Sequence, residues 1–150
     1  MLAETQITNL LYRYAECIDS GDLAGAAELF GHARIRVAAE ETVDASQLLK
    51  IWKSLIVLHA DGTPRTKHLT TNPIIEVDEE AGTASCRSYY TVLQQTDETP
   101  LQTIVAGRYH DRFERVDGRW RFSFRDLTMI DMIGDVSRHL AHPISPAQRD

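Results

Sequence analysis

The spacing of apolar residues changes once along the chain, near residue 66, and this change constrains the fold most. Before it, apolar residues recur every three or four positions, as in helices that bury one face. After it, they alternate with polar residues, as in strands. Helices followed by a run of antiparallel strands predict an α+β fold rather than an alternating α/β fold.

The N-terminal part is predicted to form three helices and one short strand. The first helix ends at "DSGD", where Gly21 supplies a stop signal and Asp22 can cap the next helix, "LAGAAELF". "ARIRVAA" alternates like a short strand, and "DASQLLKIWKSLIVL" is a third helix with Asp44 as its N-cap. The stripe of the first helix consists of Ile7, Leu10, Leu11, Tyr14, Ala15 and Ile18.

Four strand segments follow, and a "DG" turn joins the last two as a hairpin. They cover residues 66–77, 83–95, 102–116 and 119–131. The N-terminal helices are the only cover for the apolar face of such a sheet, so we expect a sheet curled around them into a cone with a mouth. Residues 1–150 are predicted to form a single domain, in which the tail 133–150 acts as a lid over the mouth or joins a neighbour.

Composition excludes several classes of function. The formal net charge of −6 argues against nucleic-acid binding, which rests on clustered Lys and Arg. No apolar run approaches the roughly 20 residues of a membrane span, and the N-terminus lacks the pattern of a secretory signal, so a cytoplasmic location is expected. Cys17 and Cys86 lack zinc spacing and are expected as reduced, buried thiols, and no metal is expected at His139 and His142.

Asp19 is the first candidate for chemistry. It lies at the C-terminal end of the first predicted helix, where a carboxylate opposes the helix dipole at a cost of about 0.3–1 kcal/mol. Asp22 has a capping role, whereas Asp19 has none. The alternative is a solvated residue of the "DSGD" turn.

His68 shares one face of its predicted strand with Thr66, Thr70 and Asn72. Such a polar face either meets solvent or lines a polar cavity, and alternation alone does not decide between them. In a cavity, an imidazole that titrates near neutrality is a natural base.

Further candidates lie on the first helix and on the third long strand. Tyr14 either packs in the core or points its phenol into a cavity as a hydrogen-bond donor. Val105, Tyr109 and Asp111 share the apolar face of their strand, where Asp111 could hydrogen-bond within a pocket. His110 faces the other way, in a charged row, and is expected to be solvated.

The last predicted strand carries Arg125. Strict alternation places Arg125, Leu127 and Met129 in one row and three aromatic residues in the other. An arginine that gives way to Leu and Met along its row indicates a pocket rim, although a surface ion pair is an equal alternative. The aromatic row consists of Trp120, Phe122 and Phe124.

Three stretches in this order resemble a known family. They are "LLYRYAECIDSGDLAGAAELF", "KHLTTNPIIEVDEEAGTASCRSYYTVL" and "GRYHDRFERVDGRWRFSFRDL". The chain resembles the SnoaL-like branch of the nuclear transport factor 2-like superfamily, which has an α+β cone fold, over residues 4 to about 132. Among its members, the relatives of scytalone dehydratase, bile acid dehydratase and hexachlorocyclohexane dehydrochlorinase are the most similar.

The resemblance implies roles for single residues. Asp19 and His68 match a His-Asp dyad that removes a proton from the substrate, and Tyr14 matches a tyrosine of the bile acid dehydratases. Arg125 matches an active-site arginine of the dehydrochlorinase, and Tyr109 falls where a cavity aromatic is found. The resemblance therefore implies a dehydratase-like lyase that needs no cofactor.

The same cone also hosts other functions. An isomerase or cyclase could use the same dyad, and a noncatalytic module could bind a ligand or serve assembly, as the small subunits of ring-hydroxylating dioxygenases do. The expected ligand is small, hydrophobic, cyclic and oxygenated. A dimer or trimer is expected through the outer sheet face that carries the aromatic row.

Overall fold

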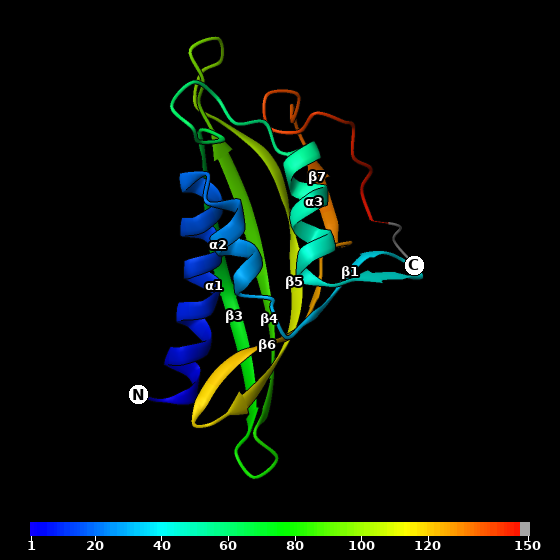
Figure 1. Cartoon of the computed structure of the whole chain (residues 1–150). Coiled ribbons are helices and arrows are strands. Elements are labelled where there is room, and N and C mark those ends of the chain that lie inside the picture. Colours follow the sequence, from blue (N-terminus) through cyan, green and yellow to red (C-terminus); the bar gives the residue numbers. More distant parts are fainter. Residues whose placement is uncertain (148–150) are drawn as a thin grey trace.

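The computed structural model describes residues 1–147 and has the expected α+β architecture. Three helices lie on one side of a curved sheet (Figure 1). They are α1 (Ala3–Ser20), α2 (Leu23–Glu28) and α3 (Ala45–Leu55). The strands are β1 (Arg34–Ala38), β2 (Glu41–Val43), β3 (Thr66–Asp78), β4 (Thr83–Gln94), β5 (Gln102–Val116), β6 (Arg119–Asp126) and β7 (Ile130–Ile133).

The sheet is built mainly from the long antiparallel strands that follow residue 66. Its order is β2-β1-β6-β5-β4-β3, with β7 paired to the N-terminal half of β5. The only parallel pairing joins β1 to β6 within the described residues. The sheet is therefore curled and open, and the helices fill its concave side. Within residues 1–147, none of the helices is long and apolar enough to cross a membrane.

The predicted helix boundaries follow from their caps. Asp44 forms a reciprocal capping box with Gln47, and the Asp22 carboxylate accepts a hydrogen bond from the Gly25 N–H. Gly21 ends α1 with a φ of 83°, and a Cβ at this position would lie 2.0 Å from the carbonyl oxygen of Gly62. Because only glycine fits this approach, the end of α1 is fixed against the loop that leads into β3.

A β-bulge in β6 changes the predicted orientation of its side chains. Phe113 pairs with Phe122 and Arg112 pairs with Phe124, so Ser123 is an extra residue. Strict alternation therefore fails, and Arg125 turns to the same inner face as Phe122. Both side chains are almost fully buried.

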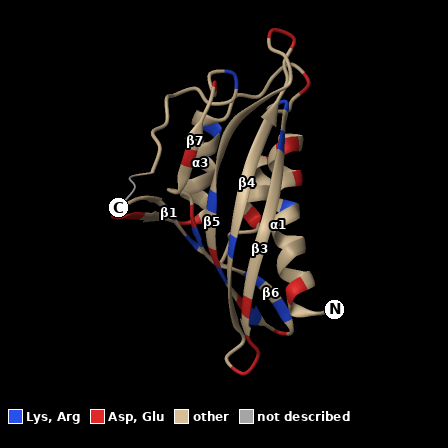
Figure 2. Cartoon of the chain, turned by 180° about the vertical axis from the view of Figure 1, so that it is seen from behind, with Lys and Arg blue, Asp and Glu red and all other residues tan. Residues whose placement is uncertain are grey.

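The predicted outer aromatic row is wrong, because Trp120 and Phe122 lie on the inner face of β6, and the bulge turns only Phe124 to the outer face. Trp120 and Phe122 belong to the core, and only Phe124 remains outside, between the guanidinium groups of Arg36 and Arg112. The oligomer expected through that row thus loses its aromatic basis. Seen from the uncovered side of the sheet, basic segments lie on β5 (Figure 2).

Three smaller expectations also needed correction. The predicted strand 119–131 is two strands, because the chain leaves β6 after Asp126 and returns to β5 as β7. The short strand β2 was not predicted. Both cysteines are free, but only Cys86 is buried, whereas Cys17 is partly exposed.

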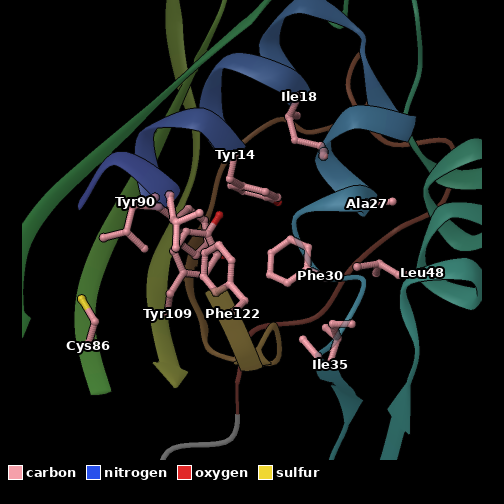
Figure 3. Close-up of a cluster of buried hydrophobic side chains, with 14 of the residues drawn as sticks. Tyr14, Ile18, Ala27, Phe30, Ile35, Leu48, Cys86, Tyr90, Tyr109 and Phe122 are labelled. Atoms are coloured by element: carbon pink, nitrogen blue, oxygen red, sulfur yellow. The ribbon is translucent and has the colours of Figure 1, made fainter. Parts of the chain in front are cut away.

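The core lies between the helices and the inner face of the sheet. The rings of Tyr14, Phe30, Tyr109 and Phe122 meet there (Figure 3). Phe30 and Phe122 lie 4.6 Å apart between ring centroids, and Tyr14 meets Tyr109 edge to face at 5.9 Å. Tyr14 and Tyr109 of this cluster are part of the wall of the cavity described next.

Candidate active site

A cavity of about 270 Å³ remains between the helices, the sheet and the chain after β7. Its volume is just below the range of roughly 300–1,000 Å³ that is typical of small-molecule pockets, so a small ligand is indicated. Most of its wall is aliphatic, with side chains from α1, α3, β4, β5 and residues 127–144. The hydrogen-bonding side chains in the wall are Tyr14, Trp52, His68, Tyr90, Tyr109 and His139.

Other hollows on the molecule are larger, and one of them, an outer groove between α1 and β3, also has Asp19 and His68 in its wall. An open groove of about 700 Å³ runs beside Arg34, Glu76 and Phe124 on the surface. Its wall contains several charged side chains and no histidine. We therefore identify the site by its imidazole and its mostly aliphatic wall rather than by volume.

Asp19 and His68 lie together at one side of the cavity. The Nδ1 atom of His68 lies 2.6 Å from Oδ1 of Asp19, and both side chains are about nine-tenths buried. An ionised carboxylate only accepts hydrogen bonds, so the proton of a neutral His68 ring belongs on Nδ1. The other ring nitrogen, Nε2, then carries a free lone pair, and the ring is part of the cavity wall.

Two further hydrogen bonds fix the Asp19 carboxylate. The Thr66 hydroxyl donates to Oδ1 at 2.8 Å, and the backbone N–H of His68 donates to Oδ2 at 2.8 Å. Desolvation raises the pKa of Asp19, but the hydrogen bonds and charge of His68, with the bond from Thr66, outweigh it and lower the pKa below its usual value. The carboxylate thus stays ionised and orients the imidazole.

A second carboxylate lies deeper in the same face of the sheet. Asp111 and Arg125 are directly opposite each other on β5 and β6, and they form a bidentate ion pair at 2.7 and 2.9 Å. The Arg125 guanidinium lies 3.8 Å from the ring centroid of Tyr109 and 4.5 Å from that of Tyr14. Desolvation would lower the pKa of Arg125, but Asp111 outweighs it and raises the pKa, so the guanidinium stays charged. Desolvation raises the pKa of Asp111, although Arg125 opposes this shift.

Two tyrosines separate that ion pair from the cavity. Burial raises the pKa of both Tyr14 and Tyr109, although Arg125 opposes this shift, so both phenols stay protonated at neutral pH. The Tyr14 ring lies 6.3 Å from the ring of His68, edge to face. Tyr14 is thus placed to offer a hydrogen bond to a ligand that contacts His68.

The structure brings some of the sequence-predicted residues to the cavity. Tyr14, His68, Val105, Tyr109 and Leu127 are part of its wall. Asp19 and Thr66 lie behind His68, which they hold in place. Thr70 was expected in the pocket but lies in an outer groove between α1 and β3, on the other side of the Asp19–His68 pair, which is also part of the wall of that groove.

Four other predicted residues do not reach the cavity. Arg125 and Asp111 are sealed beneath the tyrosine rings, because the bulge at Ser123 turned Arg125 inward. Met129 lies in a neighbouring groove, which shares Leu127 and Ile130 with the wall of the cavity. Asn72 is exposed because a second bulge in β3, where its φ is 56°, breaks the alternation that placed it beside His68.

Sequence reasoning missed several residues of the wall. Tyr90 could have been found from the alternation of β4, and Trp52 from the apolar stripe of α3. His139 and Ile144 come from the tail, where no periodicity shows which side chains turn inward. Within residues 1–147, no group of three or more His, Cys, Asp or Glu side chains is placed to hold a metal ion.

Comparison with known proteins agrees with this architecture. A family model described as "SnoaL-like domain" matches residues 1–126. A search of curated proteins found no match.

Several solved structures share the fold. A candidate scytalone dehydratase from Novosphingobium aromaticivorans is 22% identical, with a TM-score of 0.68 and 96% and 90% of the two chains covered, this chain first. LinA is 21% identical, with a TM-score of 0.60 and 83% of each chain covered. The beta subunit of a candidate aromatic-ring-hydroxylating dioxygenase, also from N. aromaticivorans, is 18% identical, with a TM-score of 0.66 and 91% and 95% covered. At these identities, the likeness concerns the fold alone.

Proposed function

Because the chain belongs to the SnoaL-like domain family, we propose that it is a cofactor-independent, dehydratase-like lyase that uses His68 and Asp19 as a proton-abstracting pair. The observation that carries the proposal is the 2.6 Å contact between His68 Nδ1 and Asp19 Oδ1, with the same imidazole in the wall of an apolar cavity. An orienting carboxylate behind an imidazole is the arrangement that prepares a general base.

The proposed reaction removes the elements of water from a small cyclic substrate. His68 Nε2 takes a proton from a carbon next to a carbonyl group, and the electrons of the broken C–H bond form a C=C bond. The C–O bond of the neighbouring hydroxyl breaks, and that hydroxyl leaves with the proton from His68 as water. His68 thereby returns to its neutral state without any cofactor.

The remaining parts of the cavity have supporting roles in this proposal. Asp19 stabilises the imidazolium that forms after proton transfer, since its lowered pKa keeps it ionised. The Tyr14 phenol donates a hydrogen bond to the substrate oxygen on which charge develops. Arg125 does not contact the substrate. It holds the two tyrosine rings from below.

Proton abstraction can be tested before the natural substrate is known. In deuterium oxide, a base in the cavity should exchange the protons next to the carbonyl of a small cyclic ketone, which NMR follows directly. We expect the protein to accelerate this exchange for at least one of cyclohexanone, α-tetralone and cyclopentanone. General-base catalysis accounts for about 10²- to 10⁴-fold, and His68→Gln should remove this factor.

A matched control is His110→Gln, because His110 is an exposed histidine on β5 outside the cavity. This variant should exchange the ketone at the parent rate. The proposal is wrong if the parent shows no acceleration over buffer with any of the ketones, or if His68→Gln exchanges as fast as the parent. In the first case, a noncatalytic ligand-binding module becomes the better reading. Elimination and isomerisation share the tested step.

A further inference from the structure

The tail after β7 is attached to the rim of the cavity by backbone hydrogen bonds. The Val57 N–H donates to the carbonyl oxygen of His139 at 2.8 Å, and the Ala141 N–H donates to the carbonyl oxygen of Leu55 at 2.7 Å. A β-bridge between Ile56 and Leu140 lies between these two bonds. Residues 139–141 therefore pair with residues 55–57, at the C-terminal end of α3, like a short antiparallel strand.

Two side chains contact the backbone carbonyl oxygen of Arg138, the residue just before His139. The amide of Gln94, which is almost fully buried, donates to the carbonyl oxygen of Arg138 at 3.1 Å. A ring nitrogen of His59 lies 2.8 Å from the same oxygen. The backbone on both sides of His139 is thus fixed, and its side chain is delivered to one place.

That place is the wall of the cavity beside the proposed base. The His139 side chain is in the wall with His68, and the two ring centroids are 6.3 Å apart. His139 is only 6% exposed, and its Nδ1 atom is buried without a hydrogen-bond partner among the described residues. A buried nitrogen of this kind costs about as much as a lost hydrogen bond, so it calls for an explanation.

The surroundings of His139 keep its ring neutral. Burial and the nearby His68 lower the pKa of His139 to about 4, although Asp19 opposes the shift. A neutral imidazole has one N–H donor and one acceptor nitrogen. It can therefore hydrogen-bond an uncharged ligand oxygen without bringing a charge into the apolar cavity.

We propose that His139 is an oxygen-binding residue of the cavity, and that the ligand carries a carbonyl or hydroxyl oxygen on the side that faces the tail. The geometry thus narrows the expected ligand class to apolar ring compounds that carry an oxygen at one edge. The assignment depends on the proposed function in one respect, namely that the C–H bond of the ligand that reacts faces His68. The tail supplies part of the site as well as covering it.

The test compares two ligands of nearly the same shape. α-Tetralone carries one ketone oxygen, and tetralin is the same bicyclic skeleton without it. Binding of each is measured by calorimetry or by the fluorescence of Trp52, which is part of the cavity wall. In His139→Phe, the preference for α-tetralone over tetralin should fall about tenfold relative to the parent, as for the loss of one hydrogen bond. The affinity for tetralin should change less than about twofold.

His142→Phe is the matched control, since His142 is an exposed histidine of the same tail. It should leave both affinities unchanged. An unchanged preference in His139→Phe would overturn the assignment. If that variant does not fold, nitrogen-15 NMR of the parent decides, because α-tetralone should shift a ring nitrogen of His139 and tetralin should not. Absence of such a shift would equally overturn it.

The outcome is separable from that of the proposed function. If ketone exchange is unchanged in His68→Gln while the preference for α-tetralone over tetralin falls in His139→Phe, His68 is not the base and His139 is still the oxygen-binding residue. If exchange is lost in His68→Gln while that preference is unchanged in His139→Phe, His139 is not the oxygen-binding residue and His68 is still the base.

Discussion

Two buried pairs, Asp19 with His68 and Asp111 with Arg125, face the same side of the sheet, yet their surroundings give them different capabilities. Asp19 meets His68 at the cavity wall, whereas Asp111 meets Arg125 beneath two tyrosine rings. The first pair contains an imidazole, whose second ring nitrogen can accept a proton. The second contains a guanidinium that is always charged and has no access to the cavity.

The contrast separates a chemical role from a structural one. Both pairs are short and both are largely desolvated, so burial and hydrogen bonding alone do not identify a catalytic pair. What distinguishes them is a titratable partner with one free nitrogen at a cavity. Each of the following experiments changes one side of this comparison.

The largest effect on stability is expected at the sealed pair. Arg125→Met leaves Asp111 buried without a partner and should lower the free energy of unfolding by about 3–5 kcal/mol. His68→Gln should cost no more than about 1–2 kcal/mol, because Asp19 keeps its bond from Thr66. Urea denaturation measures both values.

The control for the sealed pair is Asp111→Leu combined with Arg125→Met. It should recover most of the lost stability, since no unpaired charge remains. Equal losses for Arg125→Met and His68→Gln would remove the distinction between the two pairs.

A smaller effect is expected from pH, and it concerns the cavity side. The pKa of His139 is about 4 when folded and 6.5 when exposed, so between these values only the unfolded chain binds the proton. Stability is therefore complete above about pH 6.5 and is lost as the pH falls toward 4, by at most about 3 kcal/mol.

Asp19 acts in a lower window. Its pKa is lowered by folding, so its contribution to stability is present above the unfolded value and is lost only as the pH falls below about 4.

Between pH 4.5 and 7, the free energy of unfolding should therefore change less steeply with pH in His139→Phe than in the parent. Urea denaturation at both pH values gives the change in the free energy of unfolding with pH. The same change in the parent and in His139→Phe would contradict the buried, neutral state of His139.

Much of the fold could be predicted from the sequence because local periodicity determines it. The stripe of α1, the capping residues Asp22 and Asp44, and the ends of β5 follow directly from apolar spacing and turn chemistry. The long strands were found for the same reason.

The side-chain directions near the site could not be predicted as well. The bulge at Ser123 places Arg125 on the same inner face as Phe122, although alternation assigns the two to opposite faces, and the bulge at Asn72 took that residue out of the predicted polar row. A bulge adds one residue and leaves no periodic trace, so alternation misplaces the residues beyond it. His139 was missed because tertiary hydrogen bonds, not periodicity, position the tail.

The central claim is that Asp19 and His68 act as one unit, and a double-mutant cycle on ketone exchange tests it most directly. The rate of α-proton exchange is measured for Asp19→Asn, His68→Gln and the double variant. If Asp19 acts only through His68, the double variant should exchange as slowly as His68→Gln alone. Losses that multiply in the double variant would mean that the two residues act independently, and would contradict the account.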